Sequence, residues 1–184
     1  MVILIIVVAL ILFLGLVFVL IRNGIIGSRN RVEESWSGID VQLKRRHDLV
    51  PNLVETVKGY ATHEQGVFTA VTEARAEAMK AQSVEATQSA EAKLSGSLTD
   101  LRAVAEQYPN LRATENFQQL SRNLSEIEDE IQASRRIYNS NVQAYNTKIQ
   151  IFPNSIIANS GGFTPREFFE IENATDREPV EVKF

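Results

Sequence analysis

The amino-terminal stretch VILIIVVALILFLGLVFVLI, from Val2 to Ile21, contains only apolar residues and one glycine. Twenty helical residues at about 1.5 Å each span roughly 30 Å, the thickness of the hydrocarbon core of a bilayer. A helix lets a single segment satisfy its own backbone hydrogen bonds in lipid. The stretch therefore predicts a transmembrane helix, and we assign residues 1–27 to a membrane anchor and juxtamembrane segment.

Two other interpretations of this stretch fit less well. A buried core helix would need protein on every side of a uniformly apolar segment. A cleaved signal peptide has a basic region before its apolar part and small residues at its cleavage site. No basic side chain precedes Val2, and residues 22–28 offer a poor cleavage context, so an uncleaved anchor is favoured.

The basic residues nearest the apolar stretch predict its orientation. Arg22, Arg29 and Arg31 all follow it, and no lysine or arginine precedes it. Because basic residues flanking a membrane helix are retained on the cytoplasmic side, the large C-terminal part is expected to be cytoplasmic.

Composition excludes several classes of function. The 184 residues include 19 basic and 23 acidic side chains, for a formal net charge of -4, so binding of nucleic acid is not expected. The absence of cysteine excludes disulfides, thiolate metal sites and a cysteine nucleophile. Glycine-rich phosphate loops, nucleophile elbows and kinase signatures are absent too.

Beyond residue 27 the apolar residues recur at alternating steps of three and four, which is typical of amphipathic helices. We predict helices at 28–49 and 51–82, with a kink or tight break at Pro51, although one kinked helix is also possible. A third helix ends near Pro109, and a fourth runs from a cap at Thr114 to Pro153. The predicted buried residues of the fourth helix are Phe117, Leu120, Leu124, Ile127, Ile131, Tyr138, Val142, Tyr145, Ile149 and Phe152. The predicted fold class is all-α: a transmembrane helix, an antiparallel four-helix bundle over 28–153 and an irregular tail over 154–184.

The predicted tail has two features. Thr164-Pro165-Arg166-Glu167 resembles a capping box, so a short helix containing Phe168 and Phe169 should follow. Residues 179–184 alternate like an extended strand, and Phe168, Phe169 and Val182 are the candidate docking element for a partner.

The only candidates for metal or acid–base chemistry are His47-Asp48 and His63-Glu64. A zinc-protease motif needs a second histidine four residues after His63, and that position is Val67. The simpler interpretation is two partly exposed polar positions on helices. We therefore predict no catalytic, cofactor-binding or metal-binding residue and no cofactor, and a metal-dependent enzyme or regulator using His47 and His63 is the alternative.

Charged runs and asparagines on the predicted helices have structural interpretations. The basic run Lys44–Arg46 and the acidic run Glu126–Glu130 could pair across antiparallel helices, but solvated faces are favoured because exposed pairs contribute about 0–1 kcal/mol. Asn139 and Asn146 border Tyr138 and Tyr145, where they could fix helix register or oligomeric state.

Two long motifs resemble those of the LemA family. The first is NRVEESWSGIDVQLKRRHDLVPNLV, residues 30–54; the second comprises Arg136–Asn139, Tyr145–Thr147, Phe152-Pro153, Gly162-Phe163 and Phe168-Phe169. The resemblance covers nearly the whole chain and implies a bacterial single-pass membrane protein with a four-helix bundle. It implies no reaction and no agreed site residue. It also implies an association with envelope maintenance, where a membrane metalloprotease is one candidate partner.

The leading hypothesis is a non-enzymatic, membrane-anchored scaffold or adaptor of the bacterial inner membrane. Its expected partners are the lipid bilayer and either further copies of the chain or other membrane proteins, because anchoring raises local concentration. A third hypothesis is a binder of anionic lipid that uses Arg29, Arg31 and Lys44–Arg46.

Overall fold

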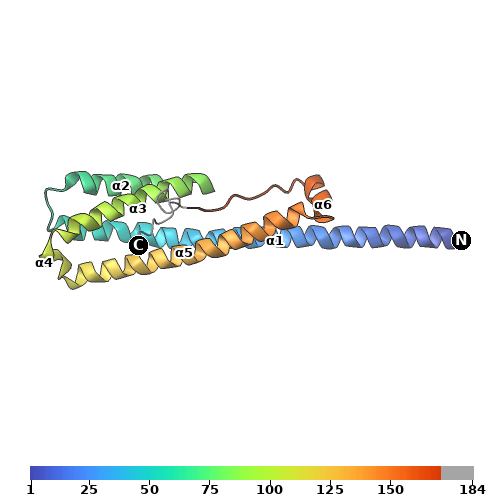
Figure 1. Cartoon of the computed structure of the whole chain (residues 1–184), viewed down its shortest axis with the longest axis horizontal. Coiled ribbons are helices and arrows are strands. Elements are labelled where there is room, and N and C mark those ends of the chain that lie inside the picture. Colours follow the sequence, from blue (N-terminus) through green and yellow to red (C-terminus); the bar gives the residue numbers. More distant parts are fainter. Residues whose placement is uncertain (171–184) are drawn as a thin grey trace, which may run out of the picture. The chain divides into compact units, whose positions relative to one another are not determined.

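The computed structural model describes residues 1–170, which form helices joined by turns and, at the end, a segment without regular structure (Figure 1). The helices are α1 (Val2–Lys58), α2 (Gln65–Ala78), α3 (Val84–Glu106), α4 (Pro109–Arg112), α5 (Glu115–Gln150) and α6 (Asn154–Ser160). The all-α prediction is confirmed for this part of the chain, which contains no strand. The count of four bundle helices is not confirmed, because the described residues form six helices. The extended segment predicted at 179–184, with Val182, lies outside them.

The chain divides into two compact units. The first unit comprises residues 1–38 and 136–168, and the second comprises residues 39–135 together with Phe169 and Glu170. Helices α1 and α5 contribute to both units.

Helix α1 does not break at Pro51, so the predicted boundaries at 28–49 and 51–82 are wrong. A proline at this position cannot donate to the carbonyl four residues earlier, which is that of His47. Arg75 of α2 supplies the missing donor: its Nε donates to the His47 carbonyl oxygen at 2.6 Å. The helix instead ends at Lys58, where Gly59 and Tyr60 form a turn.

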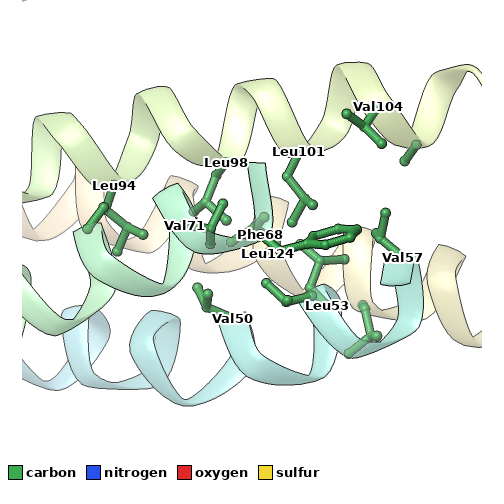
Figure 2. Close-up of a cluster of buried hydrophobic side chains, with 14 of the residues drawn as sticks. Val50, Leu53, Val57, Phe68, Val71, Leu94, Leu98, Leu101, Val104 and Leu124 are labelled. Carbon is green, nitrogen blue, oxygen red and sulfur yellow. The ribbon is translucent and has the colours of Figure 1, made fainter. Parts of the chain in front are cut away.

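One hydrophobic core fills the second unit (Figure 2). Helix α1 contributes Val50, Leu53 and Val57, and these side chains face Phe68 and Val71 of α2. The predicted spacing of three and four therefore identifies the buried faces correctly. The rest of the labelled core comes from α3 and α5: Leu94, Leu98, Leu101, Val104 and Leu124. Caps fix the starts of these two helices, because Ser83 accepts from the Ala86 N–H at 3.1 Å and Thr114 from the Phe117 N–H at 3.4 Å.

In the first unit, α5 runs antiparallel to α1, and two hydrogen bonds define the register. Asn141 Nδ2 donates to the Arg31 carbonyl at 3.4 Å, and Lys148 Nζ donates to the Gly24 carbonyl at 2.9 Å. Seven residues forward along α5 thus correspond to seven residues back along α1. The rings of Trp36 and Tyr138 lie between these helices, 5.3 Å apart.

Two predictions for the C-terminal part of the first unit are wrong. Phe152 is not buried but 79% exposed, because α5 ends at Gln150 and the chain turns before the phenylalanine could continue the buried face. The short helix expected after Thr164 does not form either, since residues 163–170 have no regular structure.

The apolar stretch that opens the chain is the exposed part of α1. Among the described residues, α1 alone is long and apolar enough to cross a membrane, and none of its most apolar 18-residue window is buried within the protein. Large side chains such as Leu4, Phe13 and Leu20 are more than half exposed. Protein therefore does not cover this segment, as a buried core helix would require.

Candidate functional site

A buried cluster of charged side chains lies in the second unit. Arg46 on α1 and Glu91 on α3 are both fully buried and form an ion pair through Nη2 and Oε2. Arg46 Nη1 also donates to Glu128 Oε1 of α5 at 2.7 Å and to Ser95 Oγ at 3.2 Å. One guanidinium thus joins three helices. Burying such a pair costs desolvation that offsets much of the attraction, so removing one partner costs more than the intact pair contributes.

His47 extends the cluster to a second oxygen of Glu91. Its Nε2 lies 2.7 Å from Glu91 Oε1, and its side chain is nearly buried. Burial, followed by the positive charges of Arg46 and Arg75, lowers the pKa of His47 from 6.5 to about 4, against smaller opposing effects of Asp48 and Asp40. His47 is therefore neutral at pH 7, and its Nε2–H donates to the Glu91 carboxylate.

A cavity of about 230 Å³ lies beside this cluster. Its lining includes His47 and Glu91, with Lys44 and Asp48 also on its wall. Lys44 and Asp48 form an exposed ion pair at 3.5 Å. Since His47, Glu91 and Arg46 bind one another, the arrangement offers no nucleophile paired with a base. Among the described residues only Arg46 Nε of this cluster makes no hydrogen bond, and the arrangement is that of a structural ion-pair network.

The two histidines do not form a shared site. His63 is exposed on the turn between α1 and α2, whereas His47 is buried on α1, so the prediction of two partly exposed helical positions is wrong for both. Within residues 1–170, no three His, Cys, Asp or Glu side chains lie close enough to hold a metal ion.

The prediction that the runs Lys44–Arg46 and Glu126–Glu130 are solvated holds for most of their residues but not for all. Lys44 and Arg45 are exposed, as are Glu126, Asp129 and Glu130. Arg46 is buried, however, and its bond to Glu128 joins the basic run to the acidic run. The alternative of pairing across helices is thus correct for one member of each run.

Sequence reasoning missed Glu91 completely, although the helical period contained a signal. Glu91 is three residues before Leu94 and four after Thr87, so it lies in phase with the buried face of α3. Arg46 and His47 likewise fill the gap in the period between Leu43 and Val50. A charged residue at a core position of each of two helices indicates a buried pair.

A second set of polar contacts holds the C-terminal segment of the first unit against α5. The Asn146 side chain makes two hydrogen bonds with the Arg166 backbone, donating to its carbonyl at 2.9 Å and accepting from its N–H at 2.8 Å. Tyr145 and Tyr138 donate to the carbonyls of Thr164 and Glu167, at 3.1 and 2.9 Å. Burial raises the pKa of both tyrosines, so they remain protonated donors. Asn146 therefore fixes the register of a returning segment of its own chain, and this contact replaces the predicted helix.

The candidate docking residues differ in accessibility. Phe169 is completely buried, and the Arg135 guanidinium lies 5.6 Å from the centre of its ring. Phe168 is half-buried. Phe169 therefore packs within its own chain and is not a free docking element.

Taken together, the helices of residues 1–170, the one candidate membrane span found among them and the buried charge cluster define a class of helical proteins with an apolar N-terminal helix. Within this class the chain belongs to the LemA family, whose profile matches residues 35–184.

Curated relatives agree with this assignment. Protein LemA of Metamycoplasma hominis is 26% identical over 141 residues, which is 74% of this chain and 63% of that protein. Magnetosome protein MamQ 2 of Paramagnetospirillum magneticum is 26% identical over 166 residues, covering 76% of this chain and 61% of that protein. Magnetosome protein MamQ of Magnetospirillum gryphiswaldense is 25% identical over 166 residues, with the same coverage. The chain thus spans about three fifths of the length of these relatives.

Proposed function

We propose that this protein is a non-enzymatic scaffold or adaptor, anchored in the bacterial inner membrane by the N-terminal part of α1. The observation that carries the proposal is the exposed apolar stretch Val2–Ile21, which continues without a break into the helical body. Such a surface is stable in lipid and costly in water. The relative that is named as a magnetosome protein supports a role at a membrane.

The charge cluster supports a structural role for the body. A reaction would need a reactive group that is free to meet a substrate, whereas Arg46, His47 and Glu91 are held by one another. Scaffolding requires only a rigid body kept at the bilayer. Anchoring confines that body to two dimensions, so weak lateral contacts with further copies or other membrane proteins become effective. A membrane metalloprotease is one partner to examine.

Cross-linking in native membranes tests the scaffold. The full chain, carrying a photo-reactive residue at exposed Val41 or Met79, should give adducts larger than the monomer. The same probe at buried Val57 is the matched control and should give none. Monomers alone from every exposed position would contradict the proposal.

The body is proposed to face the cytoplasm, because Arg22, Arg29 and Arg31 follow the apolar stretch. A tag at the C-terminus should then resist protease in intact spheroplasts and be cut after lysis. Cleavage in intact spheroplasts would reverse the orientation without affecting the scaffold proposal.

A further inference from the structure

Three arginines of the first unit line one pocket. Arg22 and Arg29 are seven residues apart on α1, which places them on the same helix face, and Arg166 comes from the segment after α6. The pocket has a volume of about 260 Å³, and its wall also includes the Gly161-Gly162 turn, Ile26 and Phe163. It is large enough for a phosphate group.

The charges in this pocket are unbalanced. Glu33 is the carboxylate nearest two of the arginines, 3.6 Å from Arg29 Nε and 3.2 Å from Arg166 Nη2. Arg22 has no ion-pair partner among the described residues. Arg29 Nε is buried but makes no hydrogen bond in this part of the chain. The pocket therefore keeps a net positive charge, and Arg29 Nε has an ion pair at 3.6 Å but no hydrogen bond, which suits an anionic oxygen ligand.

The pocket also lies at the depth of lipid headgroups if the apolar stretch spans the bilayer. Arg22 directly follows Ile21, the last residue of that stretch, and Arg29 is about 10 Å further along the helix. The headgroup layer occupies about 5–7 Å beyond each side of the hydrocarbon core. Arg22 therefore lies within the headgroup layer, and Arg29 lies just beyond it, so the pocket between them opens at the outer edge of this layer.

A second observation in the same unit points to the bilayer independently. Extending the antiparallel register from Lys148 and Gly24 by four residues places Phe152 level with Leu20, at the end of the apolar stretch. The turn after α5 and the start of α6 expose three large apolar side chains: Ile151 (51%), Phe152 (79%) and Ile156 (62%). We call these three residues the apolar tip.

We propose that the apolar tip enters the membrane interface and that the pocket of Arg22, Arg29 and Arg166 binds the phosphate of an anionic phospholipid headgroup. Acyl chains then cover the apolar side chains of the tip, while the arginines replace water molecules around the phosphate. This inference relies on the proposed anchoring but not on the proposed scaffold role. The occupant is a lipid because the same end of the unit carries both an apolar and a cationic surface.

Depth measurements test the tip. Because the chain lacks cysteine, a single nitroxide label can be placed through Phe152→Cys in the full chain, reconstituted in nanodiscs of phosphatidylglycerol and phosphatidylcholine. Ile137→Cys is the matched control, since Ile137 is also exposed on α5 but lies fifteen residues earlier in the sequence. The label at 152 should be accessible to oxygen and protected from a water-soluble nickel reagent, and the label at 137 should behave oppositely. Equal exposure of both labels to the nickel reagent would overturn the tip.

Lipid retention tests the pocket. Full chain extracted in mild detergent should retain phosphatidylglycerol over phosphatidylcholine by native mass spectrometry, and each of Arg22→Gln and Arg29→Gln should weaken retention about fivefold. Arg31→Gln removes the same charge from an exposed position outside the pocket and should change retention little. An equal loss in Arg31→Gln, or no preference for phosphatidylglycerol, would overturn the pocket.

Inorganic phosphate distinguishes the two sources of this ligand. Millimolar phosphate should not displace the retained lipid, because the free ion lacks acyl chains. Displacement at that concentration would instead assign the pocket to soluble phosphate and overturn the proposal that its ligand is a phospholipid. Membrane fractionation of the same variants reports anchoring separately: a chain that sediments with membranes but retains no lipid refutes this inference and leaves the proposed anchor intact.

Discussion

The two units each gather arginines, but they balance the charge differently. In the second unit, Arg46 is completely buried and meets two carboxylates, those of Glu91 and Glu128. In the first unit, Arg29 and Arg166 pair with one carboxylate, that of Glu33, and Arg22 pairs with none among the described residues. A buried charge must be neutralised within the protein, whereas a half-exposed charge is solvated by water and can bind a ligand. Burial and charge balance therefore separate a structural arginine from a binding one.

The largest effect should come from breaking the buried pair. Glu91→Leu leaves Arg46 buried with Glu128 as its one remaining carboxylate, and the free energy of unfolding should fall by about 3–5 kcal/mol. Urea denaturation of the full chain in detergent, followed by far-ultraviolet circular dichroism, measures this change. The double variant Arg46→Met/Glu91→Leu should recover most of the loss, because no buried charge remains unpaired.

Lys44→Met is the control for that experiment. It removes an exposed ion pair with Asp48 on the same helix and should change stability by about 1 kcal/mol or less. If Glu91→Leu lowered the free energy of unfolding as little as this control, Arg46 would have to be hydrated. The difference in charge balance between the arginines of the two units would then disappear.

The next effect concerns acid. Because the pKa of His47 is lowered from 6.5 to about 4, the unfolded chain binds a proton in this interval while the folded chain does not. Stability is therefore unaffected by His47 above pH 6.5 and decreases as the pH falls toward 4, by about 3 kcal/mol in total. His47→Gln keeps a donor for Glu91 and should show a shallower decline, since the remaining carboxylates titrate in both proteins. Identical pH profiles would mean that His47 is accessible to solvent water.

A smaller effect should arise at Pro51, where another arginine of the second unit, Arg75, bonds to the backbone of α1. Arg75→Met removes the donor to the His47 carbonyl and should cost about 1–3 kcal/mol. Pro51→Ala restores a backbone N–H that can reach the same carbonyl, so Arg75→Met should cost less in that background. A double-mutant cycle measures this coupling. Additive losses would show that Arg75 and Pro51 are independent.

The sequence predicts the faces of the helices better than their ends and their charged contacts. Spacing alone identifies Leu120, Leu124 and Ile131 as buried, because amphipathic helices bury one face. It does not place the break at Gly59, since the loss of a donor at Pro51 is compensated by Arg75, 24 residues later. Helix propensity predicts a break at Pro51, and the tertiary contact from Arg75 overrides this preference.

The candidate site shows the same limit more strongly. The helical periods of α1 and α3 mark positions 46 and 91 as internal. Arg46 and Glu91 are 45 residues apart in the sequence, however, so their pairing depends on how α1 packs against α3. The capping-box pattern at Thr164 is a local signal, and the two hydrogen bonds from Asn146 to the Arg166 backbone overrule it. Phe152 is in phase with the buried face of α5, yet the helix ends at Gln150.

The smallest effect on stability should accompany a clear effect on binding, at Glu33 in the first unit. Glu33→Gln removes the carboxylate that pairs with both Arg29 and Arg166. Both ion pairs are about half exposed, so the free energy of unfolding should change by about 1 kcal/mol or less. Retention of phosphatidylglycerol should instead increase, because the pocket gains positive charge, and native mass spectrometry of the extracted chain measures it. Glu34→Gln, the exposed neighbouring residue, controls for net charge and should leave retention unchanged. A loss of stability of several kcal/mol in Glu33→Gln, with no gain in lipid, would make this second arginine cluster structural like the first.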